Sequence, residues 1–162
     1  MSRGTKRTRR RLRLPRQPRP SQRPPKPRPR STPTSSGGQQ PGSFYFVSAS
    51  SKFECAILAQ VEAIAGCHGA LPAGAPQVPG SGAPKTLVQP NAIKVSGNTG
   101  GKFYSAGDPQ FHRFEGEAQV LPYGRTLEAG GFVCSIDRTS GVTCESKAGH
   151  GFTVSDAAYD VW

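Results

Sequence analysis

The most informative segment of this chain reads Phe132-Val-Cys-Ser-Ile-Asp-Arg-Thr-Ser-Gly-Val-Thr-Cys-Glu145. Two runs of β-forming residues flank a turn-forming segment, Asp137–Gly141, and this pattern predicts a β-hairpin. With the turn placed there, Cys134 lies opposite Cys144. Directly opposed residues have Cβ atoms about 4.5–5.5 Å apart, and a non-hydrogen-bonded pair comes closer still. We therefore expect a disulfide between these two cysteines across the hairpin.

The same reasoning applies to Cys55 and Cys67, which flank a possible turn earlier in the chain. Four cysteines permit three connectivities, and the sequence-local one fits two hairpins. An even number of cysteines in a small, loop-rich domain favours an oxidising compartment. Each disulfide would close a short loop and should contribute about 3 kcal/mol to the stability of the fold. Four reduced thiols in a cytosolic protein are the alternative. We expect no metal site, because a Cys-x-x-Cys motif is missing and the histidines are scattered.

Outward from this hairpin, short β-forming runs alternate with turn residues over most of the sequence. Lys52 to Gly66 fits two strands that turn near Ala59–Glu62, and its apolar spacing also fits a helix. Residues 68–85 suggest a surface loop, and Ser155–Tyr159 suggests one helical turn. The other expected strands are Phe44–Val47, Thr86–Gln89, Ala92–Ser96, Lys102–Ser105, Phe111–Phe114, Ala118–Leu121, Gly131–Ile136, Gly141–Glu145 and Gly151–Val154. This spacing predicts a mainly β domain, a small disulfide-stapled sandwich or barrel, over residues 44–162.

The first 43 residues have a different character, and we expect them to be a disordered tail and linker. The net charge of the chain is +11, but residues 1–30 hold thirteen Lys and Arg and no acid, whereas residues 31–162 hold eight bases and ten acids. The tail is rich in proline and almost without apolar residues, so it cannot bury enough surface to fold. Similar Arg/Pro runs arise when a GC-rich coding region is read upstream of its true start, which is a second interpretation.

A basic tail of this kind can contact polyanions without sequence preference. The densest cations are Arg7, Arg9, Arg10, Arg11, Arg13 and Arg16. Contacts of such cations with nucleic-acid phosphates release counterions, and anionic envelope polymers or lipids offer similar charge. The tail has no aromatic residue, so base stacking is not expected. The chain also shows neither a transmembrane segment nor an apolar signal peptide.

Several motifs of the domain occur in the order and spacing of a known family. These are Phe46-Val-Ser-Ala-Ser50, Phe53-Glu-Cys-Ala-Ile57, Leu121-Pro-Tyr-Gly-Arg125, Gly131-Phe-Val-Cys-Ser135, Gly141-Val-Thr-Cys-Glu145 and Gly149-His-Gly-Phe-Thr-Val-Ser155. Over residues 44–67 and 103–162 the chain resembles an actinobacterial secreted or lipoprotein-type domain of unknown function. The resemblance implies a β-rich, disulfide-stapled exported domain and implies no activity. Members often carry a further cysteine pair, near one position of which this chain has Tyr104.

Few residues suggest chemistry. His150 lies between two glycines, which allow a ligand to approach closely, and a small hydrolase that uses this imidazole is one hypothesis. The alternative is a hairpin corner in which His150 caps a carbonyl group. Tyr123 and Arg125 place an aromatic ring beside a guanidinium, which suits a planar or anionic ligand. Gly97-Asn-Thr-Gly-Gly-Lys102 superficially resembles a phosphate loop but lacks its first glycine and its Ser/Thr, so we interpret it as a turn.

The leading hypothesis from the sequence is a noncatalytic, exported β domain without a cofactor. We expect this chain to be secreted or held in the cell envelope. Its partner is expected to be another protein or a cell-envelope component. The alternative is a nonspecific nucleic-acid-binding protein that acts through its basic tail, with a cytoplasmic location.

Overall fold

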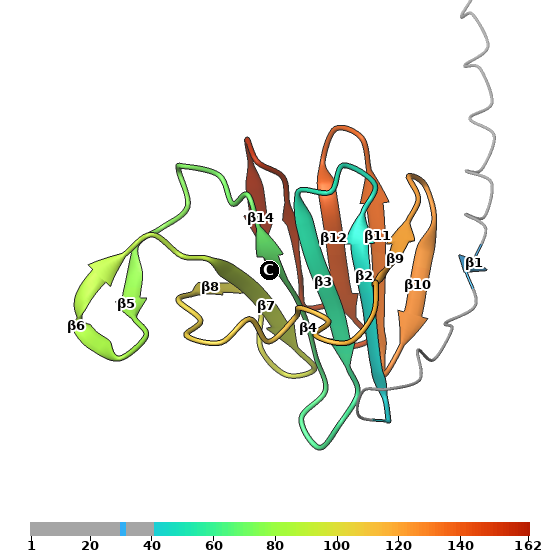
Figure 1. Ribbon diagram of the computed structural model, residues 1–162, viewed down its shortest axis with the longest axis horizontal. Coiled ribbons are helices and arrows are strands. Elements are labelled where there is room, and N and C mark those ends of the chain that lie inside the picture. The colour runs from blue at the N-terminus through green and yellow to red at the C-terminus, as the bar shows by residue number, and fades with distance from the viewer. Residues whose placement is uncertain (1–29, 32–40) are drawn as a thin grey trace, which may run out of the picture.

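The computed structural model describes residues 30–31 and 41–162, and every regular element within them is a β-strand (Figure 1). The strands are β1 (Arg30–Ser31), β2 (Ser43–Ser48), β3 (Phe53–Leu58), β4 (Ile64–Gly69), β5 (Val78–Gly80), β6 (Ala83–Val88), β7 (Ala92–Ser96), β8 (Lys102–Tyr104), β9 (Gln119–Leu121), β10 (Thr126–Ala129), β11 (Phe132–Asp137), β12 (Gly141–Ser146), β13 (Gly151–Val154) and β14 (Tyr159–Val161). The mainly β fold predicted from the sequence is confirmed.

Two six-stranded sheets pack face to face and form a sandwich (Figure 1). The first sheet has the order β8-β7-β4-β3-β2-β9, and the second has the order β1-β10-β11-β12-β13-β14. Strands β5 and β6 form a separate hairpin. Apart from β1, the two sheets come from successive parts of the chain, residues 43–121 and residues 126–161. Of the two architectures that the sequence allowed, the structure is therefore the sandwich.

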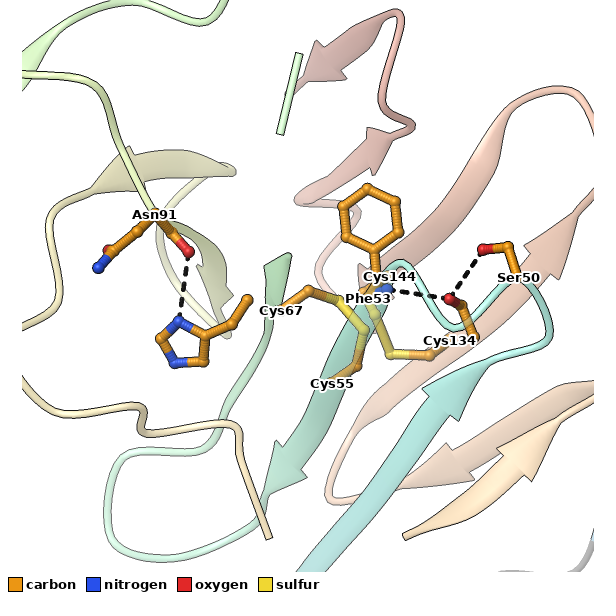
Figure 2. The surroundings of a disulfide bond; sticks show 9 residues. Ser50, Phe53, Cys55, Cys67, Asn91, Cys134 and Cys144 are labelled. Atoms are coloured by element: carbon orange, nitrogen blue, oxygen red, sulfur yellow. Dashed lines mark hydrogen bonds between the residues drawn. A yellow bond between two sulfur atoms is a disulfide. The ribbon is translucent and has the colours of Figure 1, made fainter. Parts of the chain in front are cut away.

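Both cysteine pairs are disulfide-bonded in the sequence-local connectivity, which confirms the prediction. Cys134 and Cys144 are register partners on β11 and β12, and Cys55 and Cys67 are register partners on β3 and β4. Their Cα atoms lie 4.1 Å and 4.0 Å apart, as in non-hydrogen-bonded pairs of antiparallel strands. Each sheet thus carries one cross-strand disulfide, and Figure 2 shows the two side by side in the core.

Each disulfide lies at the centre of a row of inward-facing side chains. In the first sheet the successive register partners are Phe103, Ile93, Cys67, Cys55 and Phe46. In the second sheet they are Leu127, Cys134, Cys144 and Phe152. All nine side chains are buried in one apolar cluster between the sheets. Burial of a large apolar side chain contributes about 1.5–3 kcal/mol, so these two rows provide much of the cohesion between the sheets.

The segment Lys52–Gly66 forms two strands, which confirms the strand interpretation of this segment and shows that the helical interpretation is wrong.

The turn predicted at Asp137–Gly141 is also confirmed. The carboxylate of Asp137 accepts hydrogen bonds from the N–H groups of Thr139 (2.8 Å) and Ser140 (3.0 Å). Gly141 has a φ of 83°, a conformation that suits glycine.

Three local expectations are corrected by the structure. Phe111–Phe114 is not a strand, because this segment packs across a sheet face instead of joining a ladder. Ser155 does not begin a helical turn: its N–H donates to the carbonyl of Ala158 (2.9 Å), which closes a turn between β13 and β14. The predicted loop over residues 68–85 contains β5 and the beginning of β6.

One short strand lies in the part of the sequence before the boundary expected at Ser43. Arg30–Ser31, which the sequence placed in the tail, forms β1 and pairs in parallel with β10 at the edge of the second sheet. The expectation of disorder for the rest of the tail falls on residues 1–29 and 32–40, which lie outside the described residues.

Candidate functional site

The connection between β8 and β9 crosses the whole outer face of the first sheet. β8 and β9 are the two opposite edge strands of that sheet, so residues 105–118 must pass over the strands between them (Figure 1). We call residues 105–118 the crossover. Phe111, near its middle, is only 1% exposed although it is not part of the core between the sheets. The crossover is therefore anchored to the outer face of the first sheet.

A glycine on β4 makes room for this anchor. A Cβ built on Gly66 would lie 2.2 Å from Cζ of Phe111 and 2.6 Å from the carbonyl oxygen of Ile93. No side chain larger than hydrogen fits at this position without movement of the ring or the backbone. Gly66 thus fixes where the crossover lies.

Beneath the crossover, one row of side chains runs across the outer face of the first sheet. Successive register partners in this row, one on each of the six strands, are Val120, Val47, Glu54, His68, Ala92 and Tyr104. We call Glu54 and His68, together with His112 of the crossover, the polar cluster. His112 of the crossover contributes a further imidazole, and its Nδ1–H donates to the carboxylate of Glu54 at 2.5 Å. Both side chains of this pair are well exposed, with 39% and 47% of their surface accessible. Its contribution to stability is therefore small, and it serves mainly to orient the crossover.

His68 is held differently from His112. Its Nδ1 lies 3.3 Å from the carbonyl oxygen of Asn91 (Figure 2), and because a carbonyl only accepts, Nδ1 carries the proton. Its Nε2 is buried and has no hydrogen-bond partner among the described residues. Burial lowers the pKa of His68 from 6.5, partly opposed by the bond to Asn91 and by the charge of Glu54. The ring, 5.4 Å from that of Phe111, is thus an uncharged support for the crossover.

A groove of about 320 Å³ lies where the crossover leads into β9. Its lining is mostly apolar and includes Val47, Phe111, Ala118 and Val120, with Glu54 and Glu117 as its carboxylates. Val120 is 57% exposed, and Phe114, which packs edge-on against His112, is 69% exposed. Large apolar side chains with this exposure, next to an apolar groove, are typical of an interaction surface. We call Phe114, Val120 and this groove the crossover surface.

Tyr123 and Arg125, two candidates from the sequence, lie at an end of the sandwich where several turns meet, and they do not form the expected pair. The cation over the ring of Tyr123 is Arg138, at 4.4 Å from the centroid, whereas Arg125 is exposed. Lys52 and Asp156 form an ion pair at the same end. The hollow between these turns is about 150 Å³, and Arg138 already covers the ring of Tyr123, which leaves little stacking surface for a ligand.

His150 lies at the corner between β12 and β13, and it is partly buried. Its backbone forms the corner: the N–H donates to the hydroxyl of Ser146 (3.2 Å), and the carbonyl accepts from the N–H of Ser146 (2.8 Å). The hydrolase hypothesis needs a nucleophile or a second acid–base group beside this imidazole. The hydrogen bonds described for His150 are those of its backbone with Ser146, and they give this residue a structural role in the hairpin.

The remaining candidates have other positions. The four cysteines are buried in the core and serve structure. The six arginines proposed for polyanion binding lie outside the described residues. Within residues 30–31 and 41–162, no group of three or more His, Cys, Asp or Glu side chains is arranged to hold a metal ion.

The crossover surface was not predicted from the sequence. One available signal was Gly66, a glycine in the interior of an otherwise apolar strand, which indicates a close approach by another part of the chain. The identity of the approaching residue could not be read from the sequence, because it depends on a contact across forty-five positions.

Two findings concern the chain as a whole. No helix in the described part of the chain is long and apolar enough to cross a membrane. Comparison with protein-family models, with curated proteins and with solved structures gave no match to this chain.

Proposed function

We propose that the protein is a noncatalytic binding domain that acts outside the cytoplasm and binds an extended segment of a protein partner at the crossover surface. The observation that carries the proposal is the exposure of Phe114 and Val120 beside an apolar groove at the edge of a sheet. Such a surface gains free energy when an apolar side chain of a partner covers it.

The edge strand defines the kind of partner. Within the described residues β9 pairs only with β2, so its other side is available for main-chain hydrogen bonds to an added strand. A partner segment added to β9 would place alternate side chains on the outer face, beside Val120 and over the groove. Main-chain pairing would supply general affinity, and the groove would select an apolar side chain. The partner segment is therefore extended and has apolar residues at alternate positions.

The two disulfides support an extracellular place of action. They are compatible with an oxidising compartment, and their full burial in the core makes them structural elements of the fold. We propose secretion or retention in the cell envelope on this basis. Mass spectrometry of unreduced peptides from protein isolated from its host tests this: both disulfide-linked peptides are expected, and free thiols at all four positions would contradict an oxidising location.

The binding proposal is tested by selection from a library of displayed extended peptides. Peptides with alternating apolar residues are expected, and their addition should shift the amide resonances of Gln119 and Val120. Val120→Lys, which places a charge on the edge strand, and Phe114→Ser should each weaken binding at least about tenfold.

The matched control is Leu87→Ser, because Leu87 is 59% exposed but lies on the separate hairpin β5–β6. This variant should bind the selected peptides as the unchanged protein does. Peptide binding that is unaffected by Val120→Lys and Phe114→Ser, or that is lost equally with Leu87→Ser, would refute the proposed surface.

A further inference from the structure

Two lysines on neighbouring strands of the first sheet face each other directly. Lys94 on β7 and Lys102 on β8 are register partners, so their side chains emerge from the same face of the sheet. Like charges directly opposite each other on neighbouring strands destabilise a sheet. An arrangement of this kind calls for a compensating negative charge.

Neither ammonium group lies within ion-pair distance of a carboxylate in the described part of the chain. Nζ of Lys94 lies over the ring of Tyr104, 4.7 Å from the ring centroid. Burial raises the pKa of Tyr104 to about 12, so this ring orients the ammonium group without neutralising it.

Both lysines line a hollow of about 470 Å³ on the outer face of the first sheet. On one side the turn between β7 and β8 contributes Ser96, Asn98 and Thr99, and on the other side the turn between β3 and β4 contributes Glu62 and apolar side chains. This hollow shares no lining residue with the groove of the crossover surface. It is large enough for a small molecule of several functional groups and far larger than an isolated anion.

The turn in this hollow is the segment that superficially resembles a phosphate loop, and its geometry shows why it does not act as one. The hydroxyl of Ser96 accepts from the N–H groups of Thr99 (3.0 Å) and Asn98 (3.3 Å). These amides are therefore used within the turn and are not free to surround a phosphate. An anion bound here would be recognised by the two ammonium groups, with the polar side chains of the turn beside them.

We infer that this hollow is a binding site for a phosphate group carried by a polyol, with Lys94 and Lys102 as the two cationic ligands of the phosphate. The tetrahedral anion lies between the two ammonium groups and removes their repulsion. The hydroxyl groups of the polyol reach the side chains of Asn98 and Glu62 at the rim of the hollow. The source of such a group is either a free polyol phosphate or a polymer with polyol-phosphate repeats.

The experiment is titration calorimetry on the full chain with glycerol phosphate and, in a second arm, with poly(glycerol phosphate) of defined length. Lys94→Gln and Lys102→Gln should each weaken binding about tenfold, since each removes one charged ligand of the anion. Lys85→Gln and Lys147→Gln remove exposed lysines elsewhere and should leave binding unchanged. Binding of the monomer identifies a free polyol phosphate as sufficient, and binding of the polymer alone identifies the repeat as the ligand.

A stability measurement separates the site from general charge effects. At low salt, Lys102→Gln should raise the unfolding temperature of the protein without ligand, because the opposed charge is removed. Glycerol phosphate should raise the unfolding temperature of the unchanged protein and of Lys85→Gln, but not that of the double variant at positions 94 and 102. Equal stabilisation or equal binding in all variants, or no binding of either probe, would overturn the inference. Val120→Lys changes the proposed protein-binding surface and leaves this hollow intact, so this variant should bind glycerol phosphate as the unchanged protein does. The test of the phosphate site is therefore independent of the test of the protein-binding surface.

Discussion

Gly66 and Phe111 form one unit although they lie far apart in the sequence. The aromatic ring occupies the space that any side chain at position 66 would need, and the ring is 1% exposed. The crossover therefore has a single resting place on the sheet. This contact, together with the His112–Glu54 bond, positions the part of the crossover surface that lies on the crossover, whereas the pairing of β9 with β2 places Val120.

Gly66→Ala should destabilise the fold by about 1–3 kcal/mol, because the new methyl group overlaps the Phe111 ring and the Ile93 carbonyl. Urea denaturation measures this change. Gly97→Ala is the matched control, since a Cβ built at this position meets no atom within 4 Å and its φ lies outside the left-handed region. A double variant that adds Phe111→Leu should recover part of the loss. Equal stability of Gly66→Ala and Gly97→Ala would contradict the described contact.

His68 gives the crossover a dependence on pH. Because burial lowers its pKa in the folded protein, the unfolded chain binds a proton more readily than the folded one below about pH 6.5. Stability should be fully present above that pH and should decline as the pH falls through the lowered pKa of the folded state. Thermal unfolding between pH 7.5 and pH 4.5 tests this.

The substitution His68→Leu removes the titrating group and should flatten the decline over the upper part of this pH range. His112→Gln, which removes the other imidazole of the cluster, should retain the contribution of His68. A decline of the same size in His68→Leu and in the unchanged protein would assign the pH dependence to other groups.

At the scale of elements, local pairing could be predicted from the sequence and distant pairing could not. The β11–β12 hairpin was predictable because β-formers, a turn and two cysteines lie within fourteen residues, so one turn fixes the register. The crossover was not predictable, because the short run Phe111–Phe114 fits a strand as well as a loop that packs on a sheet. The local sequence does not show that the ring of Phe111 packs against Gly66 of β4. The groove beside Val120 depends on that packing, so it could not be predicted either.

The two disulfides should stabilise their hairpins to a similar degree, because they span ten and twelve residues. Replacement of Cys134 and Cys144 by alanine should lower the free energy of unfolding by about 3 kcal/mol. The corresponding Cys55→Ala and Cys67→Ala pair should lose about as much. Urea denaturation of both double variants measures the effect, and a loss below about 1 kcal/mol for either would show that its hairpin needs no covalent link.

At the scale of the whole molecule, positive charge is concentrated in one part of the sequence. Residues 1–30 hold thirteen bases without an acid, whereas the remaining chain has slightly more acids than bases. Any polyanion bound by the protein without sequence preference should therefore contact the N-terminal segment.

This charge distribution predicts the salt dependence of DNA binding. In a full chain with Arg7, Arg9, Arg10, Arg11, Arg13 and Arg16 all changed to Gln, the slope of log affinity against log salt should fall by up to about 5. Fluorescence anisotropy with a short duplex at several salt concentrations measures both slopes. The control carries Lys52, Lys85, Lys147 and Arg125 changed to Gln and should keep the original slope. An unchanged slope in the six-arginine variant would exclude the N-terminal segment from binding.

The division of the chain between the two sheets has a consequence for its continuity. Residues 43–121 and 126–161 each build one sheet with its own disulfide, and no disulfide joins the two sheets. The short link between them passes through Gly124, which is exposed and has open space around it. A nick at this glycine would leave two internally crosslinked fragments with no covalent bond between them. Their shared apolar interior, the pairing of β1 with β10 and the Lys52–Asp156 ion pair would hold them together, so the molecule is in effect a heterodimer within one polypeptide.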